Sequence, residues 1–133
     1  MATIIFPLIL KEHETGDLDF YEDGASLIAA VEPPEVNEGA YLVMDSAGRT
    51  GSLSVTKRPQ PQFETIQLEW GRDLSEQPKS VEALLREYLE LHRRSPGEGN
   101  DIRYLLKEAR ALSEAIRRES VPWYLRPWRG RTE

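Results

Sequence analysis

The spacing of apolar residues changes its period near residue 80, and this change constrains the fold more than any other feature of the sequence. In several segments before Trp70, apolar and polar side chains alternate with a period of two, which is typical of half-buried strands. From Ser80 to Ile116 the apolar residues recur at intervals of three and four, as in helices that bury one face. A run of strands followed by a run of helices predicts an α+β fold.

Residues 37–56 form the clearest part of the strand region and predict a β-hairpin. In residues 52–56 apolar and polar side chains alternate, and in residues 41–45 Tyr41, Val43 and Asp45 would lie on the face opposite to Leu42 and Met44. The segment Asp45-Ser46-Ala47-Gly48 between them has a side-chain acceptor at its first position and a glycine suited to a positive φ. This pattern predicts a type I turn that closes into a bulge.

Three further strands are predicted at residues 3–10, 18–22 and 64–70, and three helices begin at the capping residues Asp23, Ser80 and Asn100. The expected architecture is a mainly antiparallel sheet of about five strands. A short helix follows the second strand, and a C-terminal two-helix hairpin packs on one face of the sheet. With 133 residues the chain fits one domain.

We assign this single domain to residues 1–120 and a C-terminal tail to residues 121–133. The tail interleaves aromatic and basic side chains: Trp123, Tyr124, Arg126, Trp128, Arg129 and Arg131. The tryptophans either fold back to close the core or anchor a partner, since Trp, Tyr and Arg dominate interface hot spots. Fold-back is favoured for Trp123, whereas Trp128 is kept as a candidate partner-binding residue.

The sequence contains no motif that predicts a catalytic or metal site. It has no cysteine, which excludes disulfides, thiolate ligands and thiol nucleophiles. His13 lies between two glutamates, but adjacent side chains of an extended segment point to opposite sides, and His92 lies near a helix C-terminus where its charge is favourable. We therefore expect no enzyme, no cofactor and no metal. A small enzyme whose site is assembled by the fold stays open as an alternative.

The charge of the chain is negative and unevenly distributed. The formal net charge is −6, which argues against binding to nucleic acid because phosphate contacts need a surplus of Lys and Arg. Residues 1–48 hold ten acidic residues and one basic residue, whereas residues 101–133 hold eight basic and five acidic residues. An acidic surface of this kind steers association with a basic partner.

The apolar segment at residues 2–10 is interpreted as a strand. No basic residue precedes it, and the charged residues Lys11, Glu12 and Glu14 follow where a signal peptide would be cleaved. No segment approaches the ~18–20 continuous apolar residues of a membrane span. We expect no membrane association, and the lack of cysteine favours a reducing cytoplasm.

One segment resembles a known group of proteins. The run Glu32-Pro33, Gly39-Ala40-Tyr41 and then Asp45-Ser46-Ala47-Gly48-Arg49 is similar to a pattern in small bacterial proteins: Glu-Pro, then Gly-acid-Tyr, then Asp-x-x-Gly-Arg. Proteins of this size and pattern are often similar to the immunity proteins of bacterial polymorphic or contact-dependent toxin systems. The resemblance covers about residues 24–56, and Ala40 departs from it where an acid is expected.

The resemblance and the acidic surface together predict a non-catalytic protein that neutralises a cognate basic toxin by occluding its active site. The candidate partner-binding residues are Asp17, Asp19, Glu22, Asp23, Glu35, Glu38 and Trp128. The alternative is a homo-oligomeric scaffold or interaction module without a toxin partner, such as a homodimer, which would use a sheet edge or the Trp-rich tail.

Overall fold

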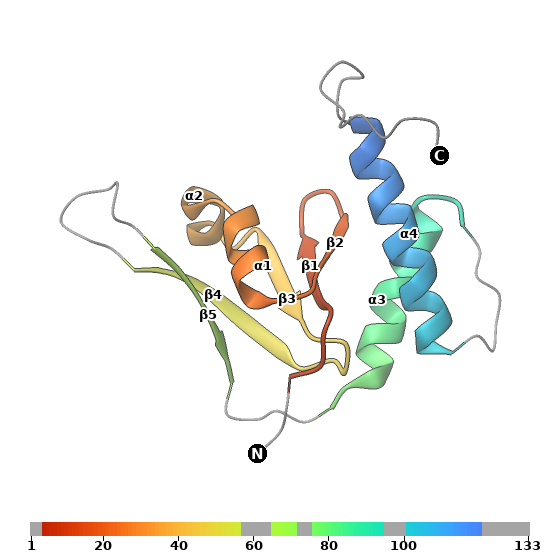
Figure 1. Ribbon diagram of the computed structural model, residues 1–133, viewed down its shortest axis with the longest axis horizontal. Coiled ribbons are helices and arrows are strands. Elements are labelled where there is room, and N and C mark those ends of the chain that lie inside the picture. The colour runs from red at the N-terminus through yellow and green to blue at the C-terminus, as the bar shows by residue number, and fades with distance from the viewer. Residues whose placement is uncertain (1–3, 57–64, 72–75, 95–100, 121–133) are drawn as a thin grey trace.

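The computed structural model describes residues 4–56, 65–71, 76–94 and 101–120 (Figure 1). Within these ranges it contains β1 (Leu8–Glu12), β2 (Leu18–Tyr21), α1 (Gly24–Ala30), α2 (Pro33–Asn37), β3 (Tyr41–Met44), β4 (Thr50–Thr56), β5 (Thr65–Trp70), α3 (Pro78–Leu91) and α4 (Ile102–Ser120).

The five strands form one sheet in the order β2-β1-β3-β4-β5, and every neighbouring pair is antiparallel. This arrangement confirms the predicted α+β fold, with its antiparallel sheet of five strands and its C-terminal helix pair. β2 and β5 form the two edges of the sheet.

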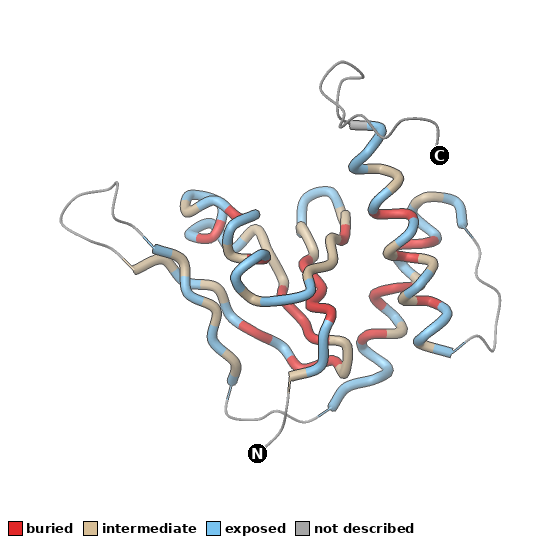
Figure 2. The backbone as a smooth tube through the Cα atoms, viewed as in Figure 1, coloured by how far each residue is buried: buried red, intermediate tan, exposed pale blue. Residues whose placement is uncertain are grey.

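The sheet separates two hydrophobic cores. Ile9 belongs to the core formed with α3 and α4, whereas its neighbours Leu8 and Leu10 belong to the core formed with α1 and α2. Because successive strand residues point to opposite faces, the helix pair covers one face and the two short helices cover the other. Figure 2 shows the buried residues of β1, β3, α3 and α4 concentrated between these layers.

The sheet curls around the short helices. α1 packs against β1 and β2 and also against β5, while α2 packs against β4. In Figure 1 the ribbon formed by β4 and β5 diverges from β3, and α1 and α2 lie in the angle between them. The helix pair α3–α4 lies beside β1 and β2, on the outer face of the curled sheet.

The first strand begins at Leu8 instead of residue 3, because the preceding residues cross the tip of the hairpin. The Ile5 carbonyl accepts the Ser46 N–H at 3.0 Å, and the Pro7 carbonyl accepts the Ser46 hydroxyl at 2.7 Å. The peptide bond between Phe6 and Pro7 is cis. These contacts tie residues 5–7 to the turn, and the ladder with β2 and β3 starts only after them.

Two helices differ from the predictions in detail. Pro33-Pro34 does end α1, but it also opens the additional helix α2, since proline is well tolerated in the first turn of a helix. α3 begins at Pro78, two residues before the predicted cap Ser80. Asn100, the predicted cap of α4, lies outside the described residues, and the neighbouring Asp101 side chain accepts the Tyr104 N–H at 2.9 Å.

The predicted type I turn is present between β3 and β4. The Gly48 N–H donates to the Asp45 carbonyl at 3.0 Å, and Gly48 has a φ of +90°. A Cβ at Gly48 would overlap the carbonyl oxygen of Gln77, so the turn needs glycine both for its backbone conformation and for its contact with the start of α3.

The Asp45 carboxylate is fully buried and holds this turn together. One oxygen accepts the N–H groups of Ala47 and Arg49 at 3.0 and 2.8 Å. The other accepts the Ile5 N–H at 3.0 Å and lies 3.2 Å from the Arg49 guanidinium, which also pairs with Glu76 at 3.2 Å.

The described helices include none with the length and apolar character of a membrane-spanning segment.

Candidate partner-binding surface

Four glutamates gather at one end of the sheet, and we call them the acidic rim: Glu12, Glu14, Glu35 and Glu38. Glu12 ends β1 and lies opposite Tyr41 in the β1–β3 register. The Tyr41 hydroxyl donates a hydrogen bond to the Glu35 carboxylate in α2, and Glu38 caps the C-terminus of the same helix. The loop after β1, which carries Glu14, lies at the same end of the molecule as α2 (Figure 1).

Glu12 lies among other carboxylates that repel its charge. Burial raises the pKa of Glu12, and the nearby carboxylates of Glu35, Asp17 and Glu14 raise that pKa further. Burial and the hydrogen bond to Glu35 also raise the pKa of Tyr41 far above its ordinary value. Among the described residues, none of the ion pairs involves a rim glutamate.

Two of the predicted partner-binding acids, Asp19 and Glu22, make ion pairs within the chain. Asp19 lies 2.9 Å from the Arg117 guanidinium and accepts the Ser113 hydroxyl at 3.3 Å. Glu22 pairs with Arg110, which lies in α4, as do Ser113 and Arg117. These contacts join the edge strand β2 and the residue after it to α4.

Asp17 faces the end of α3. Its carboxylate lies 3.5 Å from Nε2 of His92, the C-cap residue of that helix. The His92 ring also packs edge-on against Tyr88, with ring centroids 5.1 Å apart. Both contacts place His92 in a structural role, in keeping with its predicted position near a helix C-terminus.

Asp23 has the capping role that the sequence predicts. Its carboxylate accepts the Ser26 N–H at 2.7 Å at the start of α1, and this hydrogen bond lowers the pKa of Asp23. Of the six predicted acids, the structure thus places Glu35 and Glu38 on the acidic rim, while Asp17, Asp19 and Glu22 face α3 and α4. Trp128 and the tail lie outside the described residues.

A small cavity opens beside the acidic rim, where β3 and β4 separate. The β3–β4 ladder holds only Val43 with Gly51 and Met44 with Thr50, so the next pairs in this register, including Tyr41 with Leu53, are not part of it. The cavity has a volume of about 200 Å³ and is lined by α2 and by the diverging parts of both strands. We call it the seam cavity.

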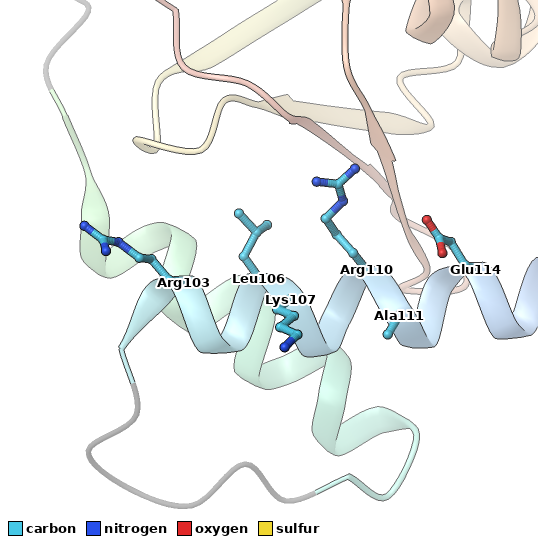
Figure 3. Close-up of a pocket in the computed structure, with 6 residues that line it drawn as sticks. All are labelled: Arg103, Leu106, Lys107, Arg110, Ala111 and Glu114. Atoms are coloured by element: carbon cyan, nitrogen blue, oxygen red, sulfur yellow. The ribbon is translucent and has the colours of Figure 1, made fainter.

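A second hollow, of about 430 Å³, lies along α4 and carries the opposite charge (Figure 3). Arg103, Leu106 and Arg110 project to the same side of the helix, with Lys107 beside them. Arg110 is engaged by Glu22. The molecule therefore presents an acidic end at α2 and a basic face on α4.

Neither histidine takes part in a metal site in the described part of the chain. His13 is exposed, and its N–H donates to the Ala40 carbonyl at 2.9 Å. No group of three or more His, Asp or Glu side chains suited to a metal ion occurs among the described residues.

Sequence reasoning missed two features of this region. It identified Asp45 as the turn acceptor, but it did not predict that the buried Arg49 pairs with Glu76, which is 27 residues further along the chain. The seam cavity has no sequence signal, because the alternation of residues 50–56 continues unchanged past the point where the ladder ends.

Comparisons of the chain with protein-family models, with curated proteins and with solved structures gave no match.

Proposed function

We propose that this chain is a non-catalytic binding protein, and specifically an immunity protein that neutralises a cognate basic toxin in the cytoplasm by occluding its active site. The acidic rim is the contact surface in this proposal. The resemblance of residues 24–56 to immunity proteins supports the class, and the rim supports the nature of the partner.

The observation that carries the proposal is the cluster of carboxylates around Glu12. Burial and then the neighbouring carboxylates raise the pKa of Glu12, so ionising Glu12 costs free energy in the isolated chain. A cationic partner would remove this cost on binding. The rim would also attract such a partner over a distance and speed its association at low salt.

The first experiment is an affinity purification of the tagged full-length chain from its own organism at native expression level, with bound proteins identified by mass spectrometry. The proposal predicts one stoichiometric basic partner that is toxic when expressed alone and harmless when co-expressed with this chain. Recovery of the chain alone would contradict it.

Charge reversal then tests the contact surface. Glu14 and Glu38 are exposed rim residues, and Glu69 and Glu90 are exposed glutamates on β5 and α3. Glu14→Lys with Glu38→Lys should slow association with the captured partner at least tenfold at low salt, with a smaller effect at high salt. Glu69→Lys with Glu90→Lys makes the same change in net charge and serves as the control. Equal slowing by both pairs would rule out the rim as the contact surface.

A second candidate is self-association through the edge strand β5, which pairs with β4 on one side. Its central residues Gln67 and Glu69 are exposed, and the strand contains no lysine or proline of the kind that blocks edge pairing. Sedimentation velocity over a range of concentrations tests this candidate. A dimer that Gln67→Lys dissociates would support it, and a monomer at all concentrations would exclude it.

A further inference from the structure

The seam cavity is framed by backbone that points into it. The His13 N–H donates to the Ala40 carbonyl across the β1–β3 pair. In an antiparallel pair, successive residues direct their backbone groups alternately to the two sides. Ala40 therefore faces β1, and the N–H and C=O of Tyr41 face β4.

The same argument applies to the other strand. The Asp45 N–H donates to the Arg49 carbonyl at 2.8 Å, which makes this pair a hydrogen-bonded one. Counting along the β3–β4 register, Gly51 and Leu53 also direct their backbone groups toward β3. The polar backbone groups of Tyr41 and Leu53 thus face each other across the open seam.

The lining of the cavity is mixed, and two glutamates lie next to lining residues in the sequence. Val36, Tyr41 and Leu53 are among its lining residues. Glu35, which accepts the Tyr41 hydroxyl, precedes Val36 in α2, and Glu38 precedes the lining residue Gly39. A volume of about 200 Å³ is smaller than the ~300–1,000 Å³ of small-molecule sites and fits a single long side chain.

We propose that the seam cavity receives an arginine side chain of a protein partner. The aliphatic stem would lie against Val36 and Leu53. The guanidinium has five N–H donors and no acceptor, so it would meet the carbonyl groups of the seam and the carboxylates of Glu35 and Glu38. The face of Tyr41 offers a further cation–π contact. The inference rests on the proposed function and deepens it, because it assigns to the basic toxin an anchoring residue.

The site can be tested without the toxin. The ¹⁵N-labelled full-length chain is titrated with Nα-acetyl-arginine amide and followed by NMR, with the neutral isostere Nα-acetyl-citrulline amide as the matched ligand. We expect the amide signals of Gly39, Tyr41 and Leu53 to shift, with saturation at millimolar ligand, and the citrulline analogue to bind at least tenfold more weakly. Equal binding of both ligands, or equal shifts around Glu69 and Glu90, would overturn the inference.

Two sets of variants locate the ligand. Ser52 lines the cavity and Ser54 does not, although both are exposed residues of β4 on the same face. Ser52→Trp should abolish arginine binding and Ser54→Trp should leave it unchanged. As a milder test that leaves the cavity open, Glu35→Gln with Glu38→Gln should weaken binding about fivefold, while Glu69→Gln with Glu90→Gln should not. Unchanged binding in Ser52→Trp or in the Glu35/Glu38 variant would contradict the site.

The inference and the proposed function fail in different ways. Binding of the arginine amide at the seam, together with no toxin in the affinity purification, would retain the cavity and reject the immunity function. Capture of a toxin with equal affinity by the wild type and by Ser52→Trp would retain the immunity function and reject the cavity as its anchor.

Discussion

The carboxylate of Asp45 accepts the backbone N–H of Ile5 at 3.0 Å, a contact between residues 40 positions apart in the sequence. The same carboxylate holds the β3–β4 turn and the buried Arg49. One turn residue thus fixes the entry into β1, the hairpin and, through Arg49 and Glu76, the approach to α3.

Replacing Asp45 should therefore destabilise the whole domain. Asp45→Ala leaves the Arg49 guanidinium buried without this partner and two or more backbone N–H groups without an acceptor, which should cost about 3 kcal/mol or more of unfolding free energy. Equilibrium unfolding in urea measures this cost. As a control, Glu82→Ala removes a half-buried pair with Arg86 within one helix and should cost about 0.5 kcal/mol. Similar losses in both variants would refute the role of Asp45.

Two glycines with positive φ provide a matched pair of substitutions. Gly48→Ala places a Cβ against the Gln77 carbonyl as well as in a left-handed conformation, whereas Gly39→Ala, with a φ of +70°, has open space around its Cβ. The second change should cost about 1 kcal/mol from backbone strain, and the first should cost clearly more. Thermal unfolding of both variants compares them. Equal midpoints would contradict the prediction and would mean that the Gln77 carbonyl can move away from the added Cβ at little cost.

Arg93 occupies a position that favours glycine. It has a φ of 60° just after α3, and the next N–H, that of Arg94, reaches back to the Leu89 carbonyl at 2.7 Å, as in a Schellman motif. Arg93→Gly should raise stability by about 0.5 kcal/mol, because relief of strain exceeds the added entropy of the unfolded chain. Arg94→Gly gains no such relief and should lower the denaturant midpoint. A loss of stability in Arg93→Gly would contradict the prediction.

The acidic rim should affect the pH dependence of stability. Folding raises the pKa of Glu12 above its ordinary value of 4.5, so the folded state favours the protonated carboxyl. Ionisation of Glu12 therefore costs stability at neutral pH, and this cost disappears as the pH falls below 4.5. Glu12→Gln should be more stable than the wild type at pH 7, with a difference that vanishes in acid. Urea unfolding at several pH values measures the difference, and a gain that persists in acid would point to another cause.

Much of the fold follows from local patterns in the sequence. Asp23, the Asp45–Gly48 turn and the apolar stripes of α3 and α4 act within a few residues of their own positions, and each is found where the sequence predicts it. The helix α2 was not predicted, because a Pro-Pro pair is found both after the end of a helix and in the first turn of a helix.

The candidate site could be predicted only in part, because its properties depend on long-range contacts. The acidic residues were evident from the sequence, but the sequence did not show which of them pair with basic residues of the same chain. Asp19 meets Arg117 almost a hundred positions later, while Glu35 meets Tyr41 six positions later. The composition of the chain does not distinguish these two carboxylates. The packing of α4 on β2 does, because it brings Arg117 to Asp19 and places no described basic side chain of α4 at Glu35.

The short β3–β4 ladder has a consequence for hydrogen exchange. Two residue pairs join β3 to β4, against six that join β4 to β5 and four that join β1 to β3. The hydrophobic core under the helix pair contains described residues of β1, β2 and β3, and none of its described residues belongs to β4 or β5. The amide protons of β4 and β5 should therefore exchange together through a local opening of lower free energy than that of β1 and α3, as one cooperative unit within a single sheet.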